Sequence, residues 1–507
     1  MTAAWAIAPL VVAVATAVAT LLVRSRPRLR DVTSLLGGAS LVVAAVGALV
    51  ASRERILVYA VGGDLFDDGV PFGILFHVDA FSGFMLALGA GVLFAALVAA
   101  TARRARDGTW FHPFWHLMSA GVMGAFATGD LFNLFVWFEV LLMASYVLVS
   151  RSADADASRA GFYYVAVNLV GSAMMLVAIG GIYATTGTLN MAGVAARAQA
   201  GGADPALYGL GALLFAAFVL KAGAFPLHSW AIEVYPASDP AVAAALAGVV
   251  KKVGVYAVLR VFGTVLSPLA GFFAAATLAV AATSVLYGGW AAVGSDDLEE
   301  MLSYSSVAQI GFVFLGVGLA LDPGLAMEVR TVAAAAAIVY AANHAVLKAT
   351  LFLAIGALER ATHATRYGAL GGAVERVPGA SYAFLACGLA LVGVPPANGF
   401  LGKLVVLDAL VQGRAWLLVA VAVVGAVLTL AYVGRAWSRV FWGELGPAVE
   451  GAGRAPRTAV AVALTLAAVA VVAGVGFGLW LGPVEGAARA ALDGTSYADA
   501  VLGGAGA

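Results

Sequence analysis

The stretch Phe218–Trp230, FVLKAGAFPLHSW, ends a long apolar segment that begins near Ala206. Pro226 cannot lie inside a helix without removing a backbone hydrogen bond, and a lysine at the centre of a membrane helix costs about 2.5–3.5 kcal/mol to insert. Irregular backbone is tolerated at membrane depth only where it faces protein or water. The stretch therefore predicts a membrane helix that is interrupted at Gly223 and Pro226, so that Lys221 meets water instead of lipid.

The composition places the rest of the chain in the same environment. Of 507 residues, 63% are hydrophobic and only 11% are charged, and the mean hydropathy is +0.97, whereas a soluble domain carries about a quarter charged residues. The formal net charge of zero gives no reason to expect a nucleic-acid partner. The single cysteine, Cys387, cannot hold an iron–sulfur cluster or close an intramolecular disulfide. We therefore expect an integral protein of the lipid bilayer, with no nucleic-acid partner, no metal and no cofactor.

Apolar runs of about 20 residues, the length that crosses the hydrocarbon core, define the predicted architecture. They predict an all-α polytopic membrane protein with about fourteen transmembrane helices, centred near residues 13, 42, 88, 120, 139, 172, 217, 249, 280, 310, 344, 395, 428 and 470. No polar connection is long enough to bury a core, so residues 1–507 are expected to form one transmembrane domain. Within it we assign spans 1–3 to 1–110, spans 4–8 to 111–262, spans 9–13 to 263–442, and the C-terminal loop with the last span to 443–507.

The placement of arginine predicts the orientation. The connections after odd-numbered spans hold sixteen arginines: Arg24, Arg26, Arg28, Arg30, Arg103, Arg104, Arg106, Arg151, Arg159, Arg360, Arg366, Arg376, Arg435, Arg439, Arg454 and Arg457. The connections after even-numbered spans, with the C-terminal tail, hold seven: Arg53, Arg55, Arg197, Arg260, Arg330, Arg414 and Arg489. Cytoplasmic loops are enriched in basic residues. We therefore expect both termini on the outer side of the cytoplasmic membrane of a prokaryote.

The lysines follow the opposite rule. All five fall within predicted spans: Lys221, Lys251, Lys252, Lys348 and Lys403. Lysine can lose its proton when it is desolvated, whereas arginine stays charged, so the pattern predicts a row of titratable groups inside the membrane. For Lys221, which is late in its span, extension of the side chain to the interface is the alternative. Lys251 and Lys252 point about 100° apart, so only one of them is expected to face the row.

Acidic and histidine side chains supply partners for these lysines. Glu139, in NLFVWFEVLLMASY, is central in its span. It is either a protonated carboxyl that bonds to a neighbouring helix or the counter-ion of Lys221. His344 and Lys348 lie one helical turn apart and share a face, which suggests a proton relay. The secondary candidates are Lys251, His228 and Asp408.

A second interrupted segment, Gly393–Lys403, reads GVPPANGFLGK and places Pro395, Pro396 and Gly399 beside Lys403. Paired interrupted helices in corresponding parts of a chain are typical of inverted repeats around an ion path at the midplane. Blocks made of spans 4–8 and 9–13 would put the two breaks in the fourth helix of each. We therefore predict two five-helix inverted repeats, with broken helices at spans 7 and 12.

The stretch Trp110–Leu117, WFHPFWHL, holds His112 and His116 at a spacing that could bind haem or a metal ion. Its four aromatic residues and the arginine cluster before it favour a belt at the membrane interface instead. We expect these residues at the interface.

Taken in order, these motifs resemble the antiporter-like subunits. This family includes the proton-translocating membrane subunits of respiratory complex I and the homologous subunits of Mrp-type multisubunit cation/proton antiporters. The resemblance covers nearly the whole chain and rests on FVWFEVLLMASYVLV (Glu139), VLKAGAFPLHSW (Lys221), VVKKVGVYAVLR (Lys252), HAVLKATLF (His344, Lys348) and GFLGKLVVLDAL (Lys403). Of the adjacent lysines, Lys252 is in the family register. The stretches WAIEVYPASDPAVAAALAG and RVFWGE look most like the D-type subunits of Mrp antiporters. Glu299 and Glu300 depart from the pattern, because relatives usually carry basic residues there.

The resemblance implies a transporter subunit, not an enzyme, that works with the other subunits of a hetero-oligomeric Na+/H+ antiporter. It implies that protons move through bound water along Glu139, Lys221, Lys252, His344, Lys348 and Lys403, and that H+ entry is coupled to Na+ export. One alternative is a proton-pumping subunit of NADH-quinone oxidoreductase or of a membrane-bound hydrogenase. Another is a scaffold that only assembles partners, which the cost of five buried lysines argues against.

Overall fold

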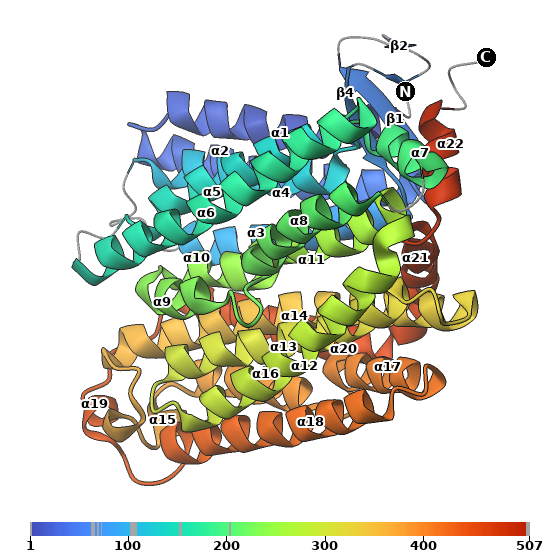
Figure 1. Cartoon of the computed structure of the whole chain (residues 1–507). Helices are drawn as coiled ribbons and strands as arrows, with labels where there is room; N and C mark the ends of the chain where they lie inside the picture. The colour runs from blue at the N-terminus through green and yellow to red at the C-terminus, as the bar shows by residue number, and fades with distance from the viewer. Residues whose placement is uncertain are drawn as a thin grey trace.

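The computed structural model describes residues 3–61, 66–67, 70–71, 73–101, 109–151, 155–201 and 204–502. Within these ranges, twelve helices are long and apolar enough to cross a membrane. They run side by side in one elongated bundle, in which the chain progresses from α1 at the top of Figure 1 to α18 at the bottom. The predicted class, an all-α polytopic membrane protein, is confirmed.

The first spans are joined by a small β-hairpin that the sequence patterns do not predict. The helices are α1 (Ala4–Leu22), α2 (Pro27–Ala51) and α3 (Ala80–Thr101). Between α2 and α3 lie β1 (Leu57–Val61), β2 (Phe66–Asp67), β3 (Val70–Pro71) and β4 (Ile74–Val78). Strand β1 pairs with β4 in antiparallel register, with Leu57 opposite Val78. The segment is short and half polar, so its pattern is hard to distinguish from that of a polar connection.

The next group of helices ends in a long segment with π-helical turns. It comprises α4 (Phe111–Ala127), α5 (Leu131–Val149), α6 (Ala155–Thr186), α7 (Met191–Gly201), α8 (Pro205–Ala222), α9 (Ser229–Ala237), α10 (Pro240–Ala245), the π-turn η1 (Leu246–Val250), α11 (Lys251–Arg260), the π-turn η2 (Val261–Val265) and η3 (Ser267–Leu269). π-Turns are rare and are frequent at functional sites.

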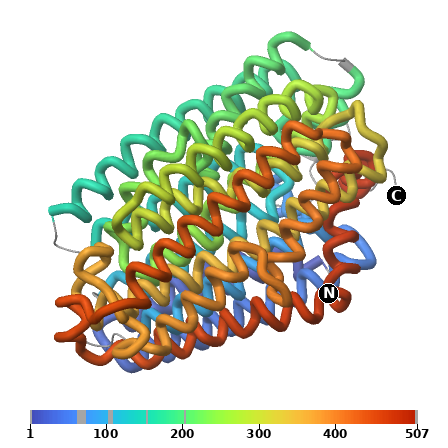
Figure 2. Tube along the Cα trace, turned by 90° about the horizontal axis from the view of Figure 1, so that it is seen from below, coloured from blue at the N-terminus to red at the C-terminus, as the bar shows by residue number. Residues whose placement is uncertain are grey.

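The second half of the chain contains the longest helix and returns to the beginning of the bundle. It comprises α12 (Ala270–Gly294), α13 (Leu298–Leu321), α14 (Met327–Thr362), η4 (Tyr367–Ala369), α15 (Ala373–Arg376), α16 (Pro378–Val392), α17 (Asn398–Gln412), α18 (Trp416–Ala436), η5 (Trp437–Phe441), α19 (Pro447–Glu450), α20 (Arg457–Val475), α21 (Phe477–Ala490) and α22 (Gly494–Leu502). Helices α20 and α21 pack against both α14 and α3. Figures 1 and 2 show both termini at the same end of the bundle, beside the β1–β4 hairpin.

The sequence predicts fourteen spans, two more than the twelve long helices found in the described ranges. The two remaining predicted centres, near residues 120 and 395, fall on α4 and on the gap between α16 and α17. Helix α4 has 17 residues and α16 has 15, at and below the lower limit of about 17 residues for a helix that crosses the hydrocarbon core. The count of fourteen and the division into inverted repeats stay predictions.

Both predicted breaks are present, and each begins with a left-handed glycine. Helix α8 ends at Gly223, whose φ is 61°, and α16 ends at Gly393, whose φ is 99°. Glycine adopts this conformation without steric cost and commonly ends helices in this way. The chain resumes as α9 after the first break and as α17 after the second.

The core lies in three helical segments that are almost wholly buried: the segment Pro240–Val265, α13 and α14. The surrounding helices expose large apolar side chains, among them Phe162, Leu417 and Leu479. The inner segments contact protein on every side, so their polar side chains are shielded from the surface of the bundle. Three of the five lysines lie in this inner group, two of them in Pro240–Val265 and one in α14.

One feature of the arginine pattern differs from the prediction, and one part of it is not described by the structure. Arg260 is predicted in a loop but lies in α11 and is 1% exposed, which strengthens the arginine bias of the remaining loops. Residues Arg103, Arg104 and Arg106, which contribute to that bias, lie outside the described ranges.

The two histidines of α4 lie inside the bundle, and their position at the membrane interface stays a prediction. His112 and His116 are buried, and Ser34 Oγ lies 2.9 Å from His112 Nδ1 and 2.8 Å from His116 Nε2. The reason is that α1 and α2 pack against α4 and cover this face. Trp110 is 49% exposed, as an interfacial residue would be.

Candidate functional site

All five lysines lie inside the bundle. Lys221, Lys251, Lys252 and Lys348 are at most 1% exposed, and Lys403 is 7% exposed. Burial of an ammonium is costly unless it is hydrogen-bonded or paired. The extension of Lys221 to the interface is therefore excluded, and the partners of each lysine decide what the row can do.

Glu139 and Lys221 face the same small cavity between α5, α6 and α8. Glu139 accepts a short hydrogen bond from Ser172 of α6. The ammonium of Lys221 has no hydrogen-bond partner in the described part of the chain, and it lies 6.0 Å from the centroid of the Tyr164 ring. The structure thus brings the predicted counter-ion and its lysine to one cavity but leaves the ion pair open.

Lys252 and His344 meet at the centre of the bundle. Lys252 Nζ is in short hydrogen-bond contact with His344 Nδ1 and donates to the carbonyl of Ala247 at 2.7 Å. Ala247 lies in the π-turn η1. An ammonium can only donate, so the imidazole Nδ1 accepts when Lys252 is charged. A lysine and a histidine in this arrangement can exchange one proton.

Lys251 points elsewhere in the same buried interior. Its Nζ lies 2.9 Å from Ser306 Oγ on α13 and 5.9 Å from the centroid of the Tyr235 ring. Both adjacent lysines are buried, because this helix is buried on all sides, and the expectation that only one of them faces the row stays a prediction. Lys252 is the one that contacts His344.

Lys348 is the first member of a chain of hydrogen-bonded side chains, most of them hydroxyl groups, that the sequence patterns do not predict. Its Nζ donates to Ser305 Oγ at 2.8 Å, and Ser305 donates to Tyr432 OH at 2.8 Å. Gln309 Nε2 donates to the same hydroxyl at 2.9 Å, and Gln309 Oε1 accepts from Tyr340 OH at 2.5 Å. The hydroxyl groups of Ser305, Tyr432 and Tyr340 both donate and accept, and the amide of Gln309 joins the two tyrosines. The chain therefore links Lys348 to Tyr340, whose ring stacks on a phenylalanine, Phe312.

A signal for part of this chain is present in the sequence. Ser305 and Gln309 are four residues apart, on one face of the apolar helix α13. Uncharged polar side chains cost little in a membrane helix, so their spacing alone does not stand out. Tyr432, from the distant helix α18, cannot be paired with them before the fold is known.

If the row carries protons, as the sequence predicts, Tyr432→Phe should slow their movement about tenfold, because the loss of a buried hydrogen bond of about 1.4 kcal/mol corresponds to that factor. The substitution leaves the donors of Ser305 and Gln309 without their shared acceptor. The measurement is the initial rate of transport in vesicles that contain the assembled complex. Tyr382→Phe, at a 55% exposed position on α16, is the matched control and should transport normally. Equal rates for both variants would remove Tyr432 from the path.

Lys403 lies against the second break. Its Nζ donates to the carbonyl of Val392, the last residue of α16, at 2.9 Å. Positive charges are favoured at helix C-termini, where carbonyl groups lack intrahelical partners. The ammonium also lies 5.3 Å from the centroid of the Phe312 ring. Phe312 therefore separates Lys403 from the end of the hydroxyl chain at Tyr340.

The structure does not bring two secondary candidates into this row. Asp408 is exposed on α17 and accepts a hydrogen bond from Gln412. His228, in the first break, packs beside Phe225 and Tyr287, with ring centroids 5.5 and 4.9 Å away.

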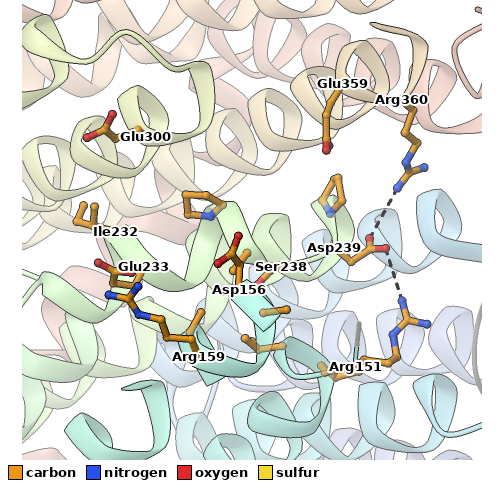
Figure 3. A pocket seen from close by; sticks show the side chains of 17 residues that line it. Arg151, Asp156, Arg159, Ile232, Glu233, Ser238, Asp239, Glu300, Glu359 and Arg360 are labelled. Carbon is orange, nitrogen blue, oxygen red and sulfur yellow. Dashed lines mark ion pairs between the residues drawn. The ribbon is translucent and has the colours of Figure 1, made fainter. Parts of the chain in front are cut away.

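A charged cavity of about 860 Å³ opens at the end of the bundle away from the hairpin. We call it the vestibule; its charged lining residues are Arg151, Asp156, Arg159, Glu233, Asp239, Glu300, Glu359 and Arg360 (Figure 3). Asp239 lies between Arg151 and Arg360, at 3.6 and 3.9 Å. Tyr235, one residue before the lining residue Pro236, is wholly buried towards Lys251. Tyr235 thus lies between the lining of the vestibule and Lys251.

Comparison with known proteins matches this arrangement to one family. Residues 128–429 match the family model described as NADH:quinone oxidoreductase/Mrp antiporter, TM. The D-type subunit of the Na(+)/H(+) antiporter of Alkalihalophilus pseudofirmus is 34% identical over 376 residues, which are 74% of each chain.

Two solved structures share the fold over nearly the full length. A chain of the Mrp complex from Dietzia sp. has a TM-score of 0.89 and 30% identity, over 99% of each chain. A chain of the membrane-bound sulfane sulfur reductase, an archaeal respiratory membrane complex, has a TM-score of 0.86 and 26% identity, over 98% of this chain and 99% of that one. The protein therefore belongs to the NADH:quinone oxidoreductase/Mrp antiporter family and is a cation/proton antiporter-like membrane subunit.

Proposed function

We propose that this chain is the proton-translocating subunit of a multisubunit Na+/H+ antiporter, a secondary transporter of the cytoplasmic membrane. The observation that carries the proposal is the contact between Lys252 and His344 at the buried centre of the bundle. A pair that only stabilised the fold would gain more from apolar side chains of similar volume. The likeness to the D-type subunit of a Na(+)/H(+) antiporter and to a chain of an Mrp complex supports a place among other subunits of such an assembly.

The proposed proton path follows the row in both directions from this pair. On one side it reaches Lys221 and Glu139, whose open ion pair can close and so change the proton affinity of the row. On the other side it passes from His344 to Lys348 and then to Lys403 through the hydroxyl chain and bound water. Protons that move along this row into the cell would be coupled to the export of Na+ by the whole complex.

The proposed orientation places the vestibule in the cytoplasm and the hairpin, with both termini, on the outer side. It rests on the arginine bias and on the position of both termini at one end of the bundle. The two breaks would then lie at equivalent positions of two inverted five-helix repeats. Other transporters with ion sites at the membrane midplane have interrupted helices at such positions.

A second function is favoured by one observation, the likeness to a chain of a respiratory membrane complex. In that case the same row would carry protons, but electron transfer elsewhere in the complex would drive them. The chain itself would hold no redox group, in keeping with its single buried cysteine.

The test uses inverted membrane vesicles from an antiporter-deficient host that expresses the full gene cluster, with and without this gene. A pH-sensitive dye reports a preformed acid-inside gradient. The antiporter predicts that added Na+ collapses the gradient only when the gene is present. Proton pumping on addition of NADH or another electron donor, with no response to Na+, would assign the chain to the redox class instead.

A further inference from the structure

A second buried polar cluster lies between the lysine row and the hairpin end of the bundle. Lys252, Tyr256 and Arg260 recur every four residues along α11 and therefore share one face of the helix. Arg260 Nη2 lies 2.7 Å from each carboxylate oxygen of Asp79, and Arg260 Nε lies 3.4 Å from Tyr256 OH. Tyr256 OH is 2.8 Å from Ser82 Oγ. The face that carries Lys252 thus continues as a hydrogen-bonded chain towards the hairpin.

The outer limit of this chain is formed by the hairpin and the last helix. The ring of His77 in β4 packs against the ring of Tyr497 in α22 at a tilt of 45°, with ring centroids 3.9 Å apart. The guanidinium of Arg260 lies 5.1 Å from the centroid of the same tyrosine ring. We call His77, Asp79, Ser82, Tyr256, Arg260 and Tyr497 the hairpin cluster. All six side chains are at most 2% exposed.

The hydrogen-bonding groups of the hairpin cluster are not all satisfied, as they would be in an ion pair that only stabilises the fold. Both ring nitrogens of His77 and the Nη1 of Arg260 are buried without a hydrogen-bond partner among residues 3–502 as far as they are described. Buried polar groups in proteins are nearly always satisfied, by protein or by ordered water. Three unsatisfied nitrogens in one cluster therefore mark a place where water molecules belong.

Two further observations favour a role of the hairpin cluster in proton transport over a purely structural role. Helix α11 is flanked by π-turns on both sides, η1 before Lys251 and η2 after Arg260, and such turns are frequent at functional sites. Burial lowers the pKa of His77 to about 4, so this side chain is neutral at neutral pH and adds no second fixed charge beside Arg260.

We propose that the hairpin cluster is a proton access route that joins the hairpin face of the bundle to Lys252. This inference rests on the proposed function. Tyr256 donates its proton to the carbonyl of Phe126 at 3.0 Å. The backbone of Lys252 lies about 6 Å away along the helix axis, and its Nζ reaches the carbonyl of Ala247, so bound water would have to join the two side chains.

As Tyr256 passes its proton to this water, it takes another from the hydroxyl of Ser82, 2.8 Å away, and Ser82 takes one from water in the cluster, so both hydroxyls stay neutral. Arg260 is permanently charged, and the carboxylate of Asp79, 2.7 Å from its Nη2, balances this charge inside the cluster.

The first test asks whether water reaches Tyr256 and uses the assembled native complex. Radiolytic hydroxyl-radical footprinting labels buried side chains that lie beside water. Tyr256 should be oxidised well above the rate of Phe262, which is equally buried on the same helical segment but packs against Phe215 and Phe273. Equal, background-level oxidation of both residues would overturn the proposal, because the cluster would then be dry.

The second test asks whether protons use the route. Tyr256→Phe should lower the initial rate of antiport about tenfold, with the complex intact, while Tyr59→Phe on the exposed face of β1 should not change it. Labelling of Tyr256 combined with a normal rate for Tyr256→Phe would also overturn the proposal. If the proposed function is wrong, the wild-type complex will show no response to Na+. The footprinting result does not depend on that response. In that case the rates of electron-driven proton pumping would be compared between the wild type and Tyr256→Phe.

Discussion

Lys252→Leu is expected to lower Na+-driven proton movement at least about 100-fold, the effect that removal of a proton-transfer group typically has. The leucine fills a similar volume in a site that is wholly buried, so the helix still packs, but His344 Nδ1 loses its contact with Lys252. The measurement is the Na+-induced collapse of an acid-inside gradient in inverted vesicles. The amount of assembled complex is quantified in the same membranes.

Lys251→Leu is the matched control for this variant. Lys251 is the adjacent residue and is equally buried, but its ammonium ends on Ser306 and not on a titratable group. It should retain most of the rate. If the two variants lose activity equally, burial of positive charge matters and the contact with His344 does not. If Lys252→Leu transports normally in an assembled complex, the proposed path is wrong.

Gly399→Ala should keep the start of α17 from packing against the end of α16 at the second break. It should therefore severely reduce the amount of assembled complex. A Cβ at this position would overlap the carbonyl oxygen of Ala390, at a distance that no real contact reaches. Since Gly399 lies inside α17, helix propensity alone would predict a gain of about 1 kcal/mol for alanine. The steric overlap is with backbone that cannot turn away, so we expect the opposite sign, a loss of about 1–3 kcal/mol or more.

Native gels and the thermal midpoint of the complex measure this effect. Gly434→Ala on α18 is the control, because a Cβ there meets nothing within 4 Å. It should assemble as the wild type does. A Gly399→Ala complex that is as abundant and as stable as this control would show that α16 and α17 can separate without cost.

The features that can be predicted from sequence are those with a large energetic penalty. A lysine or a proline inside an apolar run is costly, so Lys221, Lys348 and both breaks stand out, and the structure buries these lysines and interrupts these helices as expected. Their roles in transport remain proposals. The open state of the pair Glu139 and Lys221 cannot be predicted, because it depends on how Ser172 of α6 competes for the carboxylate.

The features that escape prediction depend on neighbours that are distant in sequence. Ser305 and Tyr432 are separated by 127 residues, and single hydroxyl groups give a weak signal in a membrane helix. The prediction for Arg260 is wrong because an arginine near the end of an apolar run usually marks a loop. Its partner Asp79 comes from another part of the chain, 181 residues away.

The position of Asp239 in the vestibule ties together helices that carry different parts of the row. Its side chain accepts from Ala241 at the start of α10 and lies near Arg151, which follows α5, and Arg360, near the end of α14. Helix α5 carries Glu139, and α14 carries His344. One carboxylate outside the row therefore holds the helix of Glu139, the helix of His344 and the start of α10 together at the vestibule end of the bundle.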